Sequence, residues 1–305
     1  MSSKNRILEN KGPKVIGTLV AHHGVAVRVA WDDGTLEMAR VDRKSGFLVG
    51  DRVYWQEHKL KREPRTTELK RATTAGQILS VAANIDCVGI VVAPKPDTSI
   101  SFADQVIVTS RVAGIKSILV LNKNDLEIFP RFQEKLLKEY GNAIDIYAVS
   151  AKTGHGIAAL TDAVSKYGRG IWVGASGVGK SSLVNNILQD AKLEVGGLSD
   201  VTGFGKHTTT TATLHRLKNG GEIVDTPGVR EFIPVKMATQ DIAQHFPGFE
   251  TILENECRFH NCMHNKEPGC VVKEAVKSEQ LSKERYNVYL GLLAQTEKRN
   301  KPDWS

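Results

Sequence analysis

The sequence predicts an α/β fold in the middle of the chain, flanked by a small β-barrel of the OB type and a helical C-terminal domain. From residue 77 onward, short apolar runs alternate with helix-like segments. Before that point the apolar positions alternate with polar ones, and after about residue 236 the chain is polar and rich in helix formers. Alternating strands and helices indicate a parallel sheet. We therefore expect domains at residues 1–72, 73–236 and 237–305.

The N-terminal pattern predicts several short strands. "KVIGTLVAHHGVAVRVAW" predicts two strands, "WDDGTLEMARV" predicts a hairpin that turns at Asp33-Gly34, and "VGDRVYW" predicts a further strand. Several short strands within roughly 70 residues favour a small OB-type barrel over a generic β-domain. Residues 59–71, "KLKREPRTTELKR", are expected to form a basic loop at the domain boundary.

The central segment contains the apolar runs "CVGIVVA", "SILVLNK", "IDIYAVS", "GIWVGAS" and "EIVDTPG". Helix-like segments such as 103–113 and 130–140 lie between several of them, which predicts helices on both faces of the sheet. Cys87 lies inside the first run and is expected in the core. The chemically distinctive residues follow the strands, where open α/β sheets bind ligands.

Charge and hydropathy narrow the possible partners. The formal net charge is +7, and residues 1–71 hold 15 Lys+Arg against 9 Asp+Glu. Such a surplus attracts polyanions such as nucleic acid, although a solvated surface is the simpler alternative. No apolar run reaches the roughly 18 residues that a membrane span needs. The N-terminus has no apolar signal segment, so we expect a cytoplasmic protein without membrane contact.

The stretch "GASGVGKS", Gly174–Ser181, matches G-x-x-x-x-G-K-S between a predicted strand and a predicted helix. Its glycines let backbone N–H groups face phosphates, and the following helix adds its dipole. Lys180 is expected to reach the β- and γ-phosphates, and Ser181 to hold Mg²⁺. The expected phosphate-site residues are Gly174, Ala175, Ser176, Gly177, Val178, Gly179, Lys180, Ser181 and Ser182.

The stretch "NKND" at residues 122–125 predicts guanine recognition. The Asp125 carboxylate can accept hydrogen bonds from N1 and the 2-amino group of guanine, a donor pair that adenine lacks. Such a site can discriminate by about 10⁴-fold. Asn122 would tie the loops together, and the Lys123 stem would cover the base. "SAK", after the next strand, would offer a backbone N–H to the guanine oxygen. The expected base-site residues are Asn122, Lys123, Asn124, Asp125, Ser150, Ala151 and Lys152.

Two further stretches predict nucleotide switches. "DTPG" ends a strand, so Asp225 is expected to contact Mg²⁺ through water and the Gly228 N–H to sense the γ-phosphate. Upstream, "GFGKHTTTT" at residues 203–211 contains a run of threonines, one of which should coordinate Mg²⁺. Thr209 is the one we favour. Loops ordered by the γ-phosphate are a common switching device.

No glutamine directly follows the D-T-P-G stretch to orient a water molecule for attack on the γ-phosphate. Ras-type GTPases place one soon after D-x-x-G, but here Val229, Arg230 and Glu231 follow. His207, at the end of the glycine-containing loop, is the nearest side chain that could orient water, since histidine hydrogen-bonds and titrates near neutrality. The simpler alternative is that His207 is only a loop residue.

The cysteine-rich stretch "CRFHNCMHNKEPGC" predicts a metal site. In a reducing compartment such a cluster favours metal over disulfides. The cysteines Cys257, Cys262 and Cys270 with one imidazole complete a tetrahedral set that suits structural zinc, and a saturated shell leaves no position for catalysis. His260 and His264 compete for the fourth place.

The order NKND, SAK, GASGVGKSS, HTTT, DTPG is that of the circularly permuted GTPases. With the OB-like N-terminus and C-x₄-C-x-H-x₅-C, the chain closely resembles the RsgA (YjeQ) family of small-ribosomal-subunit biogenesis GTPases. This resemblance implies that His264, not His260, joins Cys257, Cys262 and Cys270 on the metal. It also implies that His207 is catalytic.

The resemblance further implies a GTP hydrolase, with Mg²⁺ and one Zn²⁺, that acts late in assembly of the 30S subunit. The OB and zinc domains would contact 16S rRNA, and the chain would act as a monomer. Because the D-T-P-G switch leads into the zinc domain, loop ordering by GTP is expected to move an RNA-binding domain. Two alternatives are a GTP-gated RNA-binding scaffold and action on the large subunit.

Overall fold

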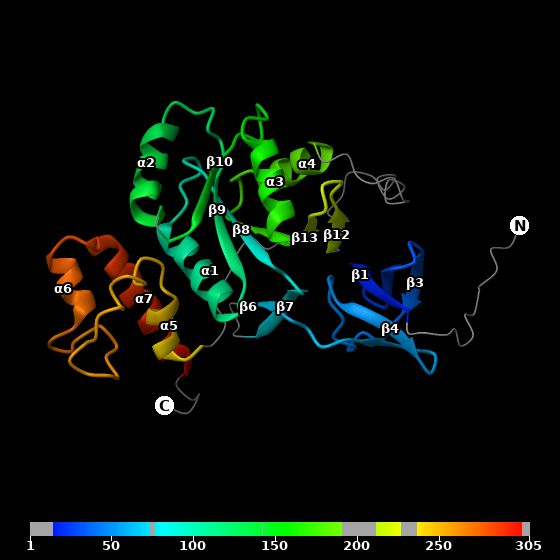
Figure 1. Cartoon of the computed structure of the whole chain (residues 1–305), viewed down its shortest axis with the longest axis horizontal. Coiled ribbons are helices and arrows are strands. Elements are labelled where there is room, and N and C mark those ends of the chain that lie inside the picture. Colours follow the sequence, from blue (N-terminus) through cyan, green and yellow to red (C-terminus); the bar gives the residue numbers. More distant parts are fainter. Residues whose placement is uncertain (1–14, 74–76, 142, 191–211, 227–236, 301–305) are drawn as a thin grey trace, which may run out of the picture.

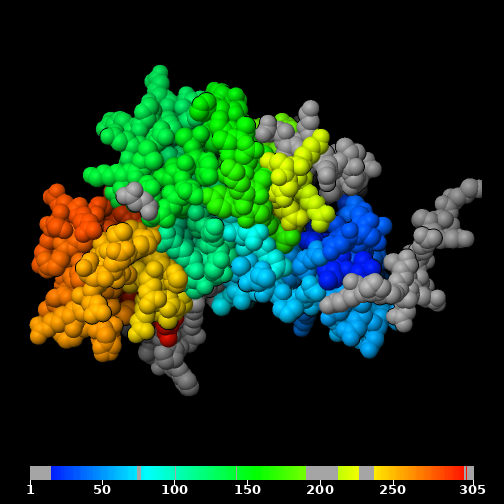
Figure 2. All heavy atoms as spheres, in the orientation of Figure 1, coloured from blue at the N-terminus to red at the C-terminus, as the bar shows by residue number. Residues whose placement is uncertain are grey.

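The computed structural model describes residues 15–73, 77–141, 143–190, 212–226 and 237–300. Figure 1 shows a β-rich region near the N-terminus, a central sheet covered by helices, and a group of helices near the C-terminus. In the space-filling view the central domain lies between the two others (Figure 2). Within the described ranges, no helix is both long enough and apolar enough to cross a bilayer.

The N-terminal strands form the barrel-like OB-type region that the sequence predicts. Its strands are β1 (Ile16–His22), β2 (Ala26–Trp31), β3 (Leu36–Arg40), β4 (Arg52–Gln56) and β5 (Lys59–Arg62). Strand β1 pairs antiparallel with both β2 and β4, while β3 pairs with β2 and β5 with β4. Buried and partly buried side chains alternate along β2, whereas five consecutive residues of β1 are buried. The core of this region includes the fully buried Leu19, Val27, Val29 and Val53.

The expected basic loop at residues 59–71 is wrong. Strand β5 lies inside it, and β6 (Glu68–Ala72) begins inside it and pairs antiparallel with β7 (Ile78–Ala83). Only Leu60 of β5 is partly buried, so pairing with β4 holds this strand without an apolar run that would mark it. The expected boundary between residues 72 and 73 falls between β6 and β7, and the domain limits stay a prediction.

The central sheet has the predicted parallel arrangement. Strands β10, β9, β8, β11 and β13 are adjacent in that order and all parallel, and β12 adds an antiparallel neighbour to β13. Their bounds are β8 (Cys87–Val92), β9 (Lys116–Leu121), β10 (Asp145–Ala148), β11 (Arg169–Val173), β12 (Thr213–Arg216) and β13 (Glu222–Asp225). All six residues of β8 are buried, which is why it reads as a continuous apolar run.

Helices cover both faces of this sheet, as predicted. They are α1 (Ile100–Val112), α2 (Phe129–Tyr140), α3 (Ile157–Tyr167) and α4 (Lys180–Asp190). Along β8, Val88 and Ile90 belong to the core formed with α1 and α2, whereas Cys87 and Val91 belong to the core formed with α3 and α4. Full burial of an aliphatic side chain such as Val88, Ile90 or Val91 stabilises the fold by roughly 1.5–3 kcal/mol.

The barrel is joined directly to the central sheet. Strand β1 pairs with β12 at Ala21 and Thr213, and the segment that holds β12 lies against the barrel in Figure 2. Arg169, at the start of β11, donates to Glu222 at the start of β13 over 2.7 Å and to the Gly50 carbonyl of the barrel over 2.8 Å. The ends of β11 and β13 opposite the loops described below are therefore fixed to the barrel.

The C-terminal helices are α5 (Thr239–His245), α6 (Val271–Lys277) and α7 (Lys283–Asn300). Their core centres on the aromatic rings of Phe246, Phe249 and Tyr289, with ring centroids 4.8–5.5 Å apart. Val108 of α1 belongs to the same core. The helical domain is therefore packed onto the α1 side of the central domain, as Figure 1 shows.

A buried ion pair crosses this contact. Arg285 of α7 is 2% exposed, and its Nη2 lies 3.1 Å from Oδ1 of Asp104 on α1, which is 0% exposed. The guanidinium also lies 4.4 Å from the ring centroid of Tyr140. Burial raises the pKa of Asp104 to about 6, although Arg285 opposes this shift.

Candidate nucleotide site and metal centre

The predicted base and phosphate loops meet at the carboxyl edge of the parallel strands. NKND follows β9, SAK follows β10, the G-x-x-x-x-G-K-S loop joins β11 to α4, and Asp225 ends β13. Because these strands are parallel neighbours, their carboxyl ends share one edge. Segments that are far apart in the sequence thus form one candidate site.

Asn122 connects three of these loops. Its side chain is buried, and its Nδ2 donates to the Val178 carbonyl over 2.8 Å. Its Oδ1 accepts the backbone N–H of Ala151 at 3.0 Å. Gly179 has φ +94°, and a Cβ there would lie 2.3 Å from the Asn122 amide nitrogen. Only glycine therefore allows this close approach.

The Lys123 side chain reaches across the phosphate loop. Its Nζ donates to the carbonyls of Lys95 and Gly177, each over 2.7 Å. Lys123 itself has φ 68°, in the left-handed region. The stem therefore spans the gap between the base loop and the phosphate loop, where a base stacked on it would be covered on one side.

Lys180 and the serines of the phosphate loop lie at the start of α4. The Lys180 ammonium donates to the carbonyls of Gly174 and Ala175 over 2.6 and 2.9 Å. Ser181 and Ser182 are exposed at the helix N-terminus. Backbone N–H groups and the dipole at this end favour an anion such as phosphate.

Asp125 presents an ionised carboxylate at the base loop. Ser150 Oγ donates to Oδ1 of Asp125 over 2.6 Å, and this bond is the main cause that lowers the pKa of Asp125. The fully buried Ser150 hydroxyl also accepts the backbone N–H groups of Lys152 and Thr153 at 3.2 and 3.1 Å. The Lys152 ammonium is 84% exposed and 3.9 Å away, so it adds little. The carboxylate is thus an acceptor suited to paired donors.

Other contacts in this region were not predicted from the sequence. Asn186 of α4 donates to the Ala151 carbonyl over 2.5 Å, and the Asn124 amide lies 2.6 Å from Nδ1 of His155. Asn186 follows another asparagine, and no local pattern marks which of the two faces the neighbouring loop. Only the packed structure identifies it.

The switch predictions are only partly covered by the structure. Asp225 ends β13, and burial raises its pKa, an effect that nearby His215 partly opposes. His207, Thr209 and Gly228 lie outside the described residues. Their roles as water-orienting, magnesium and γ-phosphate residues stay predictions.

The structure brings together the four residues that the family resemblance implies for the metal site. The possible ligand atoms of Cys257, Cys262, His264 and Cys270 all lie within 4.8 Å of one another. Nδ1 of His264 is 3.5 Å from the sulfur of Cys257 and 3.4 Å from that of Cys270. His264 is 6% exposed, whereas His260 is exposed and outside this group.

This donor set fits a soft or borderline divalent cation. Burial raises the pKa of the Cys262 thiol to about 12, and a bound cation reverses that preference because the thiolate is the ligand. Protein hydrogen bonds also contribute to the shape of the loop: Glu267 accepts backbone N–H groups of Met263 and Asn265, and the Tyr286 hydroxyl donates to the His264 carbonyl over 2.8 Å. The cluster can hold a metal with all positions filled by protein.

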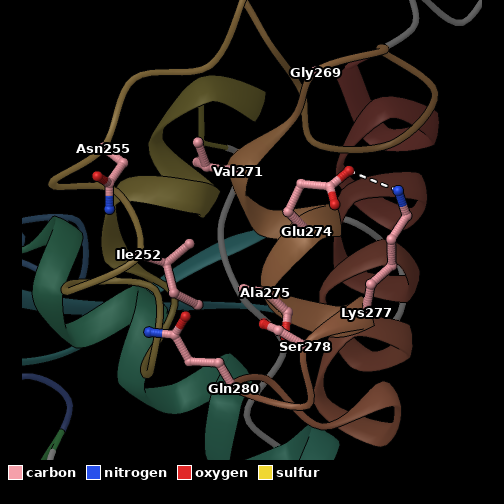
Figure 3. Close-up of a pocket in the computed structure, with 9 residues that line it drawn as sticks. All are labelled: Ile252, Asn255, Gly269, Val271, Glu274, Ala275, Lys277, Ser278 and Gln280. Carbon is pink, nitrogen blue, oxygen red and sulfur yellow. Dashed lines mark hydrogen bonds and ion pairs between the residues drawn. The ribbon is translucent and has the colours of Figure 1, made fainter.

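A separate hollow of about 630 Å³ lies beside the metal loop in the C-terminal domain (Figure 3). Ile252, Val271 and Ala275 form its apolar part, and the ion pair of Glu274 and Lys277 borders it. None of the predicted nucleotide-site residues lines it. It is therefore distinct from the loops at the sheet edge.

The fold and the two loops define a P-loop GTPase of circularly permuted connectivity, in which the guanine-recognition loop precedes the phosphate loop. The family model for the RsgA GTPase matches residues 62–233. The chain belongs to this family.

Similar proteins agree over nearly the whole chain. "Small ribosomal subunit biogenesis GTPase RsgA" of Pseudomonas putida is 37% identical over 298 residues, covering 93% of this chain and 86% of the relative. The protein of that name from Azotobacter vinelandii is 37% identical over 297 residues with the same coverage.

Solved structures agree with the fold. YjeQ from Thermotoga maritima superposes with a TM-score of 0.74 at 28% identity, covering 95% of this chain and 100% of that one. YloQ, described as a circularly permuted GTPase, superposes with a TM-score of 0.70 at 23% identity, covering 99% of this chain and 100% of that one. The latter likeness concerns the fold alone.

Proposed function

We propose that this GTPase binds the small ribosomal subunit during its biogenesis and that its nucleotide state sets how long it stays there. The observation that carries the nucleotide part is the bond from Asn122 to the Val178 carbonyl, which joins the base loop to the phosphate loop. The subunit is proposed from the names of the relatives, which span nearly the whole chain.

Each predicted residue has a proposed role in GTP binding and hydrolysis. Asp125 reads N1 and the 2-amino group of guanine, and Lys180 contacts the β- and γ-phosphates. Ser181 and Thr209 hold Mg²⁺, and Asp225 contacts it through water. His207 orients the attacking water, since no glutamine follows D-x-x-G in the sequence.

The end domains are proposed to bind rRNA. The excess of basic residues over residues 1–71 supports this for the barrel. For residues 237–305 the support is the names of the relatives, which match nearly the whole chain. The proposed structural zinc at the four converging side chains would stabilise the region with little regular structure between α5 and α6. The protein is proposed to act as a cytoplasmic monomer with domains 1–72, 73–236 and 237–305.

The decisive experiment is GTP turnover measured with and without purified small subunits. Stabilisation of the transition state by a partner accelerates related GTPases by about 10³–10⁵-fold, and we expect a large stimulation here. Large subunits form the matched control and should stimulate little. Equal turnover in all three conditions would remove the proposed partner.

The residence proposal needs a separate measurement. Affinity for the small subunit is measured with a non-hydrolysable GTP analogue and with GDP. We expect tighter binding with the analogue. In the sequence, β12 lies between the two predicted switch segments, and it pairs with the barrel strand β1. Ordering of the switches by the γ-phosphate would therefore act on the barrel, which is proposed to bind rRNA. Equal affinities would contradict nucleotide control of residence.

A further inference from the structure

A chain of hydrogen bonds runs from the phosphate-binding helix to the base-reading carboxylate. Asn186 of α4 donates to the Ala151 carbonyl over 2.5 Å. The same peptide unit ends in the Lys152 N–H, which donates to Ser150 Oγ over 3.2 Å. The Ser150 hydroxyl donates in turn to Asp125 Oδ1 over 2.6 Å. Every donor points in the same direction along this chain, so each bond polarises the next.

The direction of these bonds follows from their chemistry. The Ala151 carbonyl can only accept, so the amide nitrogen of Asn186 is the atom that faces it. Ser150 has one hydroxyl proton, which goes to the carboxylate, while its lone pairs accept backbone N–H groups. Ser150 is fully buried and Asn186 is half-buried. Water therefore competes little with the inner part of the chain.

We propose that Asn186 is a positioning residue for guanine recognition, which acts on Asp125 through the peptide at residues 151–152 and Ser150. The inference rests on the proposed role of Asp125 as the guanine reader. Helix α4 begins at Lys180, so the element that holds phosphate also fixes the loop that orients the carboxylate. Base recognition and phosphate binding are thereby coupled through one side chain.

The test replaces the donor with an acceptor. Asn186→Asp places a carboxylate oxygen against the Ala151 carbonyl and breaks the first bond of the chain. Affinities of the full chain with Mg²⁺ are measured for guanosine diphosphate and for inosine diphosphate, which lacks the 2-amino group. We expect guanosine diphosphate to bind about tenfold more weakly. Inosine diphosphate should lose less, because it does not make the 2-amino contact with Asp125.

Gln189→Glu is the matched control, since it makes the same amide-to-carboxylate change on an exposed position of α4. It should keep the wild-type affinities for both nucleotides. Should Asn186→Asp fail to fold, as judged by thermal melting, Asn186→Leu removes the donor without adding charge and is read in the same way.

The ratio of the two affinities decides the inference. A reduced preference for guanosine over inosine diphosphate in the Asn186 variants alone supports the positioning role. Equal losses for both nucleotides, or no loss, would overturn it, because general loosening of the site weakens both alike. A wild-type chain that binds guanosine and adenosine diphosphates equally would instead overturn the proposed function itself.

Discussion

The nucleotide loops and the metal cluster obtain their geometry in opposite ways. The base and phosphate loops come from distant parts of the chain and are placed by the ends of β9, β10 and β11. The side chains of β9 and β11 are largely buried, and three of the four in β10 are partly buried. The proposed metal ligands come from one stretch, residues 257–270, between the short helices α5 and α6. A sheet edge fixes its loops through packing, whereas a short irregular segment would depend on the ion proposed for its side chains. Loss of the metal should therefore leave nucleotide binding intact, and loss of nucleotide binding should leave the metal in place.

Removal of the proposed metal should cost the most folding free energy, and the loss of structure should stay within the loop between α5 and α6. Structural zinc contributes on the order of 10 kcal/mol of folding free energy in small domains. We expect His264→Ala to lose the bound metal and to unfold the loop between α5 and α6. Metal content by elemental analysis and hydrogen exchange of residues 246–270 measure this.

The control is His260→Ala, which removes the exposed histidine outside the ligand group. It should keep one metal ion per chain and wild-type protection. Loss of guanine-nucleotide affinity in His264→Ala, in parallel with loss of the metal, would show that the two sites are not independent.

A change in the base loop, at Asp125, should abolish the preference for guanine and leave the proposed metal in place. Asp125→Asn keeps the size of the side chain but replaces one acceptor oxygen with a donor, so N1 and the 2-amino group of guanine lose their partner. We expect the preference for guanine over adenine nucleotides to fall by about 10²-fold or more. Competition binding measures the preference, and unchanged selectivity would exclude Asp125 as the reader.

Breaking the buried ion pair between the central and C-terminal domains should lower the free energy of unfolding more than breaking an exposed ion pair of the C-terminal domain. Arg285→Leu leaves Asp104 buried without its partner, and loss of one member of such a pair costs about 3–5 kcal/mol. Lys277→Ala breaks a pair whose members are 69% and 62% exposed, and should cost under about 1 kcal/mol. Chemical denaturation measures both. Equal costs would show that the buried pair does not hold the domains together.

A smaller effect should appear in the dependence of stability on pH. Because burial raises the pKa of Asp104 to about 6 from an unfolded value of about 3.9, the folded state retains a proton that the unfolded state loses. The contribution of this carboxyl to stability is therefore fully present below about pH 3.9 and is lost as the pH rises through 6. Asp104→Asn should remove this part of the profile. A variant with the wild-type profile between pH 4 and 7 would contradict the assignment.

The sequence predicts those features whose cause is local. Strand β8 is found because every one of its residues is buried, and the phosphate loop is found because its chemistry requires glycines at fixed spacing. Strand β5 is missed because most of its side chains are exposed and it is held by pairing with β4. A strand of that kind leaves no apolar pattern.

Contacts between side chains that are far apart in the sequence cannot be predicted from local patterns. Arg285 and Asp104 are 181 residues apart, and each alone reads as a surface charge. Asn186 acquires its partner only when α4 packs beside the loop after β10. For the metal, the spacing defines the ligand types but leaves His260 and His264 open. The family resemblance implies His264, and in the folded loop His264 is the histidine beside the three cysteines.

The central claim is that loops from separate strands form one pocket for a guanine nucleotide. Calorimetric titration of the purified chain with guanosine and adenosine diphosphates, with Mg²⁺ present, tests it most directly. We expect guanosine diphosphate to bind at least about 10³-fold more tightly. Equal affinity for the two nucleotides would contradict the account.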